Sequence, residues 1–195
     1  MTREQLEHII RASGSITDEK VLLILGSQSI LGAIPEPPPE LCLSTEADIC
    51  PIRTPDKIDL ISGSIGELSH FQETFGYYAH GLPPNACALP IDWEKRLIEI
   101  SNPNTNGFVG LCLAPLDMAC AKLAAGREKD IEFVQAMLTH RLLDLDQLSS
   151  RSQDIPTEEQ RTAASRNLAI LRGRNRTMRS LREPEIPTDE HPKWG

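Results

Sequence analysis

Five consecutive apolar residues, Val21–Leu25, stand between polar residues on both sides. A run of this length is typical of a short strand that is buried on both faces of a sheet. Gly26 and Ser27 follow it at once, and the segment Ser27–Ala33 has only Gly32 as a helix breaker. We therefore expect a central strand, a tight turn and a short helix, in that order.

Other strands are predicted from alternating or short apolar segments, which are residues 41–49, Phe75–His80, Arg96–Ile100 and Phe108–Leu113. The last two flank the turn-forming segment Asn102–Gly107 and predict a hairpin. In residues 41–49 the alternation places Glu46 and Asp48 on the same face of the strand. The chain thus has the elements of a small mixed sheet.

Helices are predicted where apolar residues recur at steps of three and four. The segments are residues 3–12, 56–68, 115–126, 128–139, 142–148 and a helix that begins at Pro156. Thr2 and Gln5 have the spacing of a capping box, Ser13–Ser15 is expected to end the first helix, and Gly173 predicts a kink or a stop in the last one. The fold class is α+β, with a small mixed sheet, flanking helices and a helical C-terminal half.

The predicted organisation has four parts. Residues 1–114 form an α/β core, residues 115–152 a helical part of the same domain, residues 153–183 a basic helical tail and residues 184–195 a disordered terminus. An apolar run of about 18 residues, which a membrane span needs, does not occur. The polar N-terminus lacks the apolar core of a signal peptide, so we expect a cytoplasmic protein.

Cysteine and histidine spacing argues against a structural zinc site. The five cysteines contain no C-x-x-C pair and the five histidines no H-x-x-x-H pair. Because each cysteine lies in an apolar neighbourhood, we expect buried free thiols.

Charge is distributed unevenly along the chain. The net charge is −8, but from Arg151 onward eight Arg and one Lys stand against seven Asp and Glu, which gives +2 and leaves −10 on the first 150 residues. Residues Arg161–Arg182 contain seven arginines and no acid. Two interpretations are equally favoured: a surface for the phosphates of RNA, or a basic helix that docks on the acidic body.

Two features of the first half suggest chemistry. A strand that turns through Gly26-Ser27 into a helix presents backbone N–H groups and a hydroxyl that suit phosphate oxygens. Two carboxylates on one face, Glu46 and Asp48, repel each other, and a divalent cation removes that repulsion. Taken alone, the Gly26-Ser27 segment is more simply explained as an ordinary turn, and Glu46 and Asp48 as two solvent-facing acids.

Together these features resemble the polymerase-beta-like nucleotidyltransferase superfamily. The segment Leu116–Asp130, with its Lys-Leu…Arg-x-Lys-Asp pattern, is similar to that of AbiEii-type toxins. A closer resemblance, over about residues 1–150, is to an uncharacterised bacterial family of predicted nucleotidyltransferases, through Gly-Ser-Gln-x-Ile-Leu-Gly32, Glu46-Ala-Asp48, Phe75–Gly81 and Asn104–Gly107.

The resemblance implies roles for individual residues. Gly26 and Ser27 would bind the nucleotide phosphates, Glu46 and Asp48 would hold Mg²⁺, and Lys122 would bind the triphosphate. Arg127 would join the nucleotide-binding residues, and Asp130 would complete the site or orient Lys122. Eight residues make just over two helical turns, so Lys122, Gly126 and Asp130 share a face if the helix is continuous. The alternative is a surface lysine and an exposed capping aspartate.

The sequence departs from the superfamily pattern in three respects. The loop after Gly-Ser is longer than usual and proline-rich, and the first acid is a glutamate, Glu46, where the superfamily more often has aspartate. The third carboxylate, which the superfamily uses as general base, is not obvious in this sequence. Glu99 is the best candidate, although a simple exposed strand acid is the more favoured interpretation. The resemblance implies Mg²⁺-dependent transfer of a nucleotidyl group from an NTP to an acceptor hydroxyl, with RNA as a candidate acceptor. The alternative is an inactive binding module, such as one partner protein of a toxin–antitoxin or defence pair.

Overall fold

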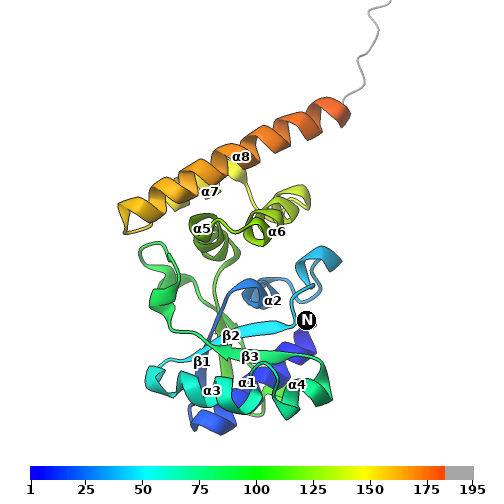
Figure 1. Ribbon diagram of the computed structural model, residues 1–195, viewed down its shortest axis with the longest axis vertical. Coiled ribbons are helices and arrows are strands. Elements are labelled where there is room, and N and C mark those ends of the chain that lie inside the picture. Colours follow the sequence, from blue (N-terminus) through cyan, green and yellow to red (C-terminus); the bar gives the residue numbers. More distant parts are fainter. Residues whose placement is uncertain (183–195) are drawn as a thin grey trace, which may run out of the picture.

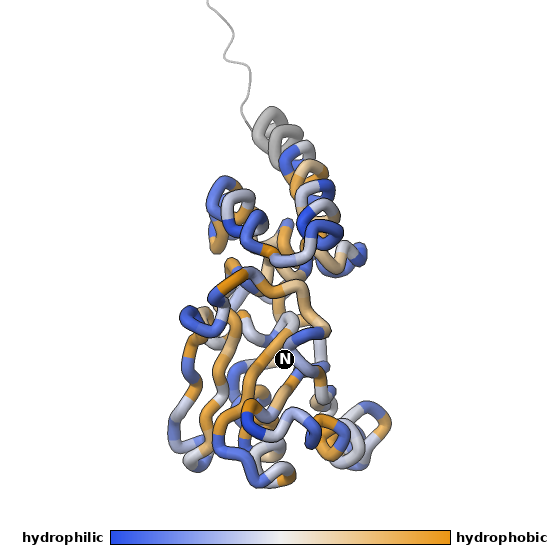
Figure 2. Tube along the Cα trace, turned by 90° about the vertical axis from the view of Figure 1, so that its left-hand side faces the viewer, coloured by the Kyte–Doolittle hydropathy of each residue, from blue (hydrophilic) through white to orange (hydrophobic). Residues whose placement is uncertain are grey.

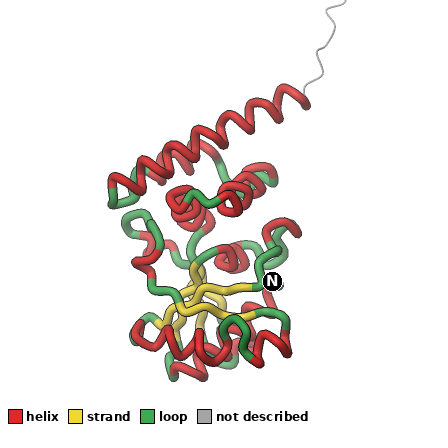
Figure 3. Tube along the Cα trace, viewed as in Figure 1, coloured by secondary structure: helices red, strands yellow, loops and turns green. Residues whose placement is uncertain are grey.

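A computed structural model describes residues 1–182, with side chains as far as residue 174 (Figure 1). The predicted disordered segment 184–195 lies outside the described residues. A five-stranded sheet with its helices forms one half of the molecule, and a group of four helices forms the other (Figures 1 and 3). The predicted α+β class, with a mixed sheet and a helical C-terminal half, is confirmed. No helix within residues 1–182 is both long and apolar enough to cross a membrane.

The sheet is built around the apolar run Val21–Leu25. Its five strands are β1 (Val21–Leu25), β2 (Glu46–Pro51), β3 (Tyr78–Gly81), β4 (Ile98–Ile100) and β5 (Val109–Cys112), in the spatial order β3-β2-β1-β5-β4. The central β1 runs antiparallel to β2 and parallel to β5, and β4 and β5 form the predicted antiparallel hairpin. Leu22–Leu25 have at most 1% exposure, so this strand is buried on both faces as predicted.

The second strand is shorter than predicted. It begins at Glu46 instead of residue 41, and Pro39–Leu41 forms a 3₁₀ turn. The last residue of β1, Leu25, lies opposite Asp48, and the first residue of β3, Tyr78, lies opposite Glu46. Residues before Glu46 therefore have no neighbouring strand in the sheet, and alternation alone does not make them a strand.

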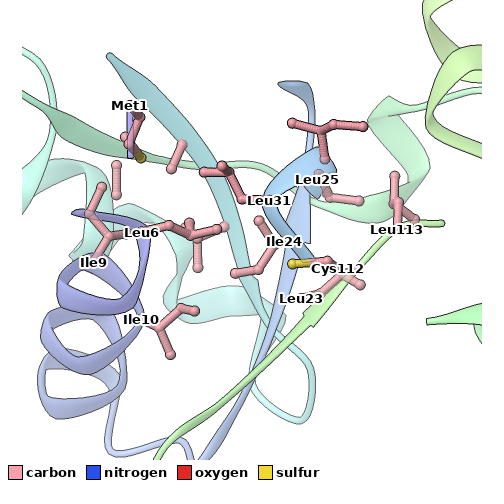
Figure 4. Packing of buried hydrophobic residues seen from close by; sticks show 14 of the residues in the cluster. Met1, Leu6, Ile9, Ile10, Leu23, Ile24, Leu25, Leu31, Cys112 and Leu113 are labelled. Carbon is pink, nitrogen blue, oxygen red and sulfur yellow. The ribbon is translucent and has the colours of Figure 1, made fainter. Parts of the chain in front are cut away.

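One face of the sheet is covered by α1 (Arg3–Thr17) and α3 (Ile58–Ile65). Glycines allow the close approach, because a Cβ on Gly110 would lie 2.5 Å from Ile10 and a Cβ on Gly81 would lie 2.1 Å from the Ile58 carbonyl oxygen. Figure 4 shows the apolar side chains of α1 packed against those of β1. The short helices α2 (Ile30–Ala33) and α4 (His70–Phe75) complete this half, and α4 was not predicted.

Helix α1 continues for five residues beyond its predicted end at residue 12. The capping box of Thr2 and Gln5 is present as predicted. The expected stop at Ser13–Ser15 is wrong, since the helix runs through these residues. Gly14 faces the Phe108 ring, which would lie 2.2 Å from a Cβ there. The helix ends instead at Asp18, which adopts the left-handed conformation.

The helical half consists of α5 (Pro115–Ala125), α6 (Glu128–Thr139), α7 (Leu145–Ser152) and α8 (Glu158–Arg182). Helix α8 lies across α5 and α7 (Figure 1), and Ala164, Leu168 and Leu171, which follow one another at steps of four and three, are buried. The same steps predict that Asn175 and Met178 continue this face of the helix, but their side chains lie outside the described ones. The predicted stop at Gly173 is wrong, since the helix continues to Arg182, and the predicted kink stays a prediction. Figure 2 shows that hydrophobic residues gather on the strands, whereas α8 alternates polar and apolar positions.

A buried carboxylate joins the two halves. Residues 82–97 connect the opposite edge strands β3 and β4. Asp117 of α5, with no exposed surface, accepts hydrogen bonds from Arg96 of that connection and from Arg151 of α7, at 2.8 and 2.7 Å. Both arginines also donate to the Ile91 carbonyl oxygen. This cluster fixes the connection against α5 and α7.

We predict that α8 is an integral part of the folded domain. Replacing Leu171 by Ala removes a fully buried side chain that packs with α5 and α7. We expect the free energy of unfolding to fall by about 3 kcal/mol, the usual cost of such a cavity. Urea denaturation measures the change. The exposed Arg166→Ala variant on the same helix serves as the control and should change it by less than about 0.5 kcal/mol. Equal values for the two variants would show that α8 is only loosely docked.

Candidate functional site

Two acids and a histidine converge at the edge of the sheet. Glu46 and Asp48 lie on one face of β2, as predicted. Strand β3 runs parallel to β2 with His80 opposite Asp48, so the imidazole shares that face. Its Nδ1 atom lies 3.4 Å from Asp48 Oδ1 and 3.5 Å from Glu46 Oε1. Within the described residues, this is the only group of three or more His, Cys, Asp or Glu whose ligand atoms all lie within 4.8 Å of one another.

The electrostatics of this cluster favour a positive charge. Burial raises the pKa of Glu46, and the neighbouring Asp48 carboxylate raises it further, while His80 and Lys129 oppose the increase. The side chains of Glu46 and Asp48 keep 34% and 22% of their exposure, so a small ion can reach their oxygens. Two carboxylates and an imidazole are all metal-ligand types, and the donor set therefore fits a divalent cation.

The Gly26-Ser27 turn is in direct contact with Asp48 of the acid pair. Gly26 has φ +60° and ψ −158°, a conformation that is essentially restricted to glycine. A Cβ at this position would lie 2.1 Å from Asp48 Oδ2. The Gln28 amide donates to the Ser44 carbonyl oxygen at 3.0 Å and so ties the turn to the residues before β2. The two motifs that the sequence suggested separately thus form one site.

The helix after the turn is present but short. Ser27–Ser29 forms a 3₁₀ turn, and α2 adds only four residues. A single turn has a weak helix dipole, because few peptide units add to it. The helix terminus therefore contributes little to anion binding, and a phosphate at this turn needs charged side chains.

Lys122 supplies such a charge directly at the turn. Its Nζ atom donates to Ser27 Oγ at 2.8 Å and to Asp130 Oδ1 at 3.0 Å, and it lies 4.5 Å from the centre of the Phe133 ring. The side chain is only 9% exposed. The alternative of a surface lysine is therefore wrong for this chain.

Lys122 and Asp130 meet as predicted, but by a different geometry. Helix α5 ends at Ala125, Gly126 adopts φ +66°, and α6 starts at Glu128, so the pair spans a turn and not a continuous helix. A Cβ on Gly126 would lie 2.6 Å from Asn167 Nδ2, and this amide donates to the Leu123 carbonyl oxygen. Helix α8 thereby helps to hold the turn that brings the two charges together.

Asp130 pairs with two positively charged side chains, Lys122 and Arg127. It has no exposed surface and accepts from Lys122 and, at 2.6 Å, from Arg127 Nε. Burial alone would raise the pKa of Asp130, but these donors outweigh it and the pKa lies below its usual value of 3.8. Burial lowers the pKa of Lys122, against the opposing effect of Asp130. The Arg127 side chain is 64% exposed, so part of its guanidinium remains accessible.

The structure does not bring Glu99 to the acid pair, and the expectation that it supplies the third carboxylate is corrected here. The register through β1 and β5 places Glu99 on the same face of the sheet as Asp48. However, β4 is the opposite edge strand, three strand positions from β2, which at about 4.8 Å per strand is roughly 14 Å. Glu99 is exposed there, as the alternative interpretation expected.

His80 is the site residue that the sequence did not reveal. The alternation of Tyr78 and His80 in a short strand was visible, but the position of that strand beside β2 was not. Cys87, from the connection after β3, also lies near the site, and burial together with the Asp48 charge raises the pKa of its thiol to about 11. The described cysteines are all free, and Cys42 and Cys87 are only partly buried, in contrast to the expected full burial.

Comparison with known proteins identifies one family. A family model described as "Nucleotidyltransferase of unknown function (DUF6036)" matches residues 4–174. The match includes all of the residues discussed above and extends into α8, beyond the end near residue 150 that the sequence resemblance had indicated. No curated protein and no solved structure gives a significant match.

We predict that Asp130 stabilises the fold by neutralising Lys122. Asp130→Asn leaves the lysine buried without its counter-ion and should lower the free energy of unfolding by about 3 kcal/mol at pH 7. Because the folded-state pKa is lowered, this contribution is complete at neutral pH and is lost as the pH falls below 3.8 and through the folded-state pKa. Urea denaturation at pH 7 and at decreasing acidic pH checks both statements.

The matched control for this prediction removes both charges. In the double variant Lys122→Met/Asp130→Asn no buried charge is left unpaired, so most of the lost stability should return. A double variant as unstable as Asp130→Asn would show that the loss comes from something other than the ion pair.

Proposed function

The chain belongs to this family of nucleotidyltransferases of unknown function, and we propose that it transfers a nucleotidyl group from a nucleoside triphosphate to an acceptor hydroxyl at the site just described. One observation carries the proposal: the Gly26 turn lies against the Asp48 carboxylate, with the Lys122 ammonium on the adjacent Ser27 hydroxyl. Groups that suit phosphate and groups that suit a cation are thus neighbours, as a metal–nucleotide complex requires.

In the proposed reaction, the acceptor oxygen forms a bond to the α-phosphorus. The bond from that phosphorus to the oxygen that bridges it to the β-phosphate breaks, pyrophosphate leaves, and the proton of the acceptor hydroxyl passes to water. Glu46 and Asp48 would hold a divalent cation, which supplies positive charge against the phosphates and the leaving group. Mg²⁺ is the ion that the family resemblance implies.

The helical half provides positively charged side chains for the phosphates. Lys122 is fixed by Asp130 at the Gly-Ser turn, so its ammonium is oriented before a nucleotide binds. Arg127 shares the same carboxylate, and part of its guanidinium remains accessible for a phosphate oxygen. Fixed donors of this kind stabilise developing negative charge without having to reorganise during the reaction.

We predict that NTP and a divalent cation together stabilise the protein. Ligands that bind only the folded state raise the free energy of unfolding, by about 2.7 kcal/mol at 100-fold excess over Kd. Asp48→Asn should abolish this increase, because it removes a carboxylate from the cation site. Glu99→Gln is the matched control, since this exposed acid lies at the other edge of the sheet, and it should respond like the wild type.

Thermal and urea denaturation with each of the four NTPs, with Mg²⁺ and with Mn²⁺, tests this prediction. If no combination shifts the wild-type protein, the nucleotide site does not exist. An increase that persists in Asp48→Asn would place the nucleotide elsewhere.

A second candidate function is a binding module that keeps the fold without catalysis, such as one partner of a toxin–antitoxin or defence pair. It is favoured by the composition of the cluster, in which the described residues provide no third carboxylate within 4.8 Å. The two functions differ in one measurable product. An enzyme releases pyrophosphate and incorporates label from an α-labelled NTP into an acceptor, whereas the module gives the stabilisation alone.

The proposed acceptor class is RNA, bound through the arginines of α8. Of those whose side chains are described, Arg166, Arg172 and Arg174 are exposed. Arg161 donates to the carbonyl oxygens of Ile155 and Pro156, and Arg172 lies 3.8 Å from Asp146. Some arginines of the helix therefore contact the domain and others face the solvent. The docked-helix interpretation accounts for the first group and the RNA-surface interpretation for the second.

We predict that RNA binding weakens steeply with salt. Three to five phosphate contacts give a slope of about −2 to −4 in log K against log salt. The double variant Arg166→Gln/Arg174→Gln should reduce the magnitude of that slope by about 1.5, whereas Lys20→Gln/Arg53→Gln, at exposed positions outside α8, should not change it. Titration of tRNA at several salt concentrations measures both. Binding that is absent at low salt, or unaffected by the α8 variant, refutes this role.

A further inference from the structure

We infer that His80 is the third ligand of the cation site and that the site consequently prefers a first-row transition ion, specifically Mn²⁺, over Mg²⁺. This inference rests on the proposed cation–nucleotide site and names its metal. The observation behind it is the ligand set itself, two carboxylates from one strand and one imidazole from the next, whose ligand atoms lie within 4.8 Å of one another.

The sheet register fixes His80 in this position. Because β2 and β3 pair in parallel with Asp48 opposite His80, the two side chains leave neighbouring backbone positions on the same face. The Nδ1 atom is nearly equidistant from one oxygen of each acid, at 3.4 and 3.5 Å. An ordinary ion pair would bring the imidazole close to a single carboxylate, as in the 2.5 Å contact of His140 with Glu40.

The three side chains leave the site open on one side. His80 keeps 47% of its side-chain exposure, and Glu46 and Asp48 keep smaller fractions. An ion held by all three would retain open coordination positions toward solvent. Phosphate oxygens at the Gly26 turn are then available as the remaining ligands, since that turn touches Asp48.

Ligand chemistry decides which ion suits this set. Mg²⁺ is bound almost entirely by oxygen, whereas imidazole nitrogen is a good ligand for the first-row transition ions. Mn²⁺ shares with Mg²⁺ the preference for carboxylate, phosphate and water oxygens, and as a first-row transition ion it also accepts the imidazole nitrogen, so a site with one nitrogen and several oxygens favours Mn²⁺ over Mg²⁺. A cluster made only of carboxylates would have no nitrogen ligand by which to favour Mn²⁺ over Mg²⁺.

The direct test is pulsed electron paramagnetic resonance of Mn²⁺ bound to the full chain in the presence of a non-hydrolysable NTP analogue. A directly bonded imidazole gives a ¹⁴N modulation of the electron spin echo. We expect that modulation in the wild-type protein and in His70→Ala, which removes a fully exposed histidine of α4. It should disappear in His80→Ala. This readout does not depend on catalytic activity.

Affinity provides the second test. Calorimetric titration with Mn²⁺ and with Mg²⁺ should show that His80→Ala weakens Mn²⁺ binding on the order of tenfold and changes Mg²⁺ binding much less. His80→Asp should restore an all-oxygen set and bring the Mn²⁺ and Mg²⁺ affinities closer together. Far-UV circular dichroism and urea denaturation confirm that each variant is folded, and the wild-type spectrum remains decisive if one is not.

The outcomes separate this inference from the function on which it rests. A wild-type protein that binds Mn²⁺ and NTP without ¹⁴N modulation, or with equal Mn²⁺ and Mg²⁺ affinities in wild type and His80→Ala, overturns the role of His80 and leaves the nucleotide site standing. A protein that binds neither ion and no NTP overturns both.

Discussion

The buried ion pair between Lys122 and Asp130 holds the candidate site together. Lys122 belongs to α5 of the helical half, yet its ammonium lies on Ser27, directly after the central strand of the sheet. Burying a lysine is costly unless a counter-charge is supplied, and Asp130 supplies it at 3.0 Å. Without this pair the Lys122 ammonium could not lie beside the Gly26 turn, and the site would consist only of the acids on β2 with His80.

The pair in turn explains why the helical half is built as it is. Lys122 and Asp130 meet only because α5 stops at Gly126, and Asn167 of α8 packs against that glycine. Helix α8 is therefore part of the site's supporting structure, although its composition suggested a separate basic tail. The family match, which extends to residue 174, includes this part of α8 and agrees with that interpretation.

Local patterns in the sequence predicted the site up to the point where strand order became decisive. The central strand, the shared face of Glu46 and Asp48, and the helices around Lys122 follow from periods of two and of three to four, which depend on neighbours in sequence. Glu99 and His80 are both strand residues in short alternating segments. Only the order β3-β2-β1-β5-β4 places His80 beside Asp48 and Glu99 at the other edge, and no pattern in the chain contains that order.

The site brings opposite charges from the two halves of the molecule together. Glu46 and Asp48 are on the sheet, while Lys122 of α5 and Arg127, directly before α6, lie on the helical side and share the Asp130 carboxylate. The proposed metal–nucleotide complex has the complementary arrangement, with its cation toward the sheet and its phosphates toward the helices, so its binding would depend on the distance between the halves. The buried Asp117, which binds both Arg96 and Arg151, joins the halves at a second point. The packing of residues 82–97 would therefore contribute to the geometry of the proposed site.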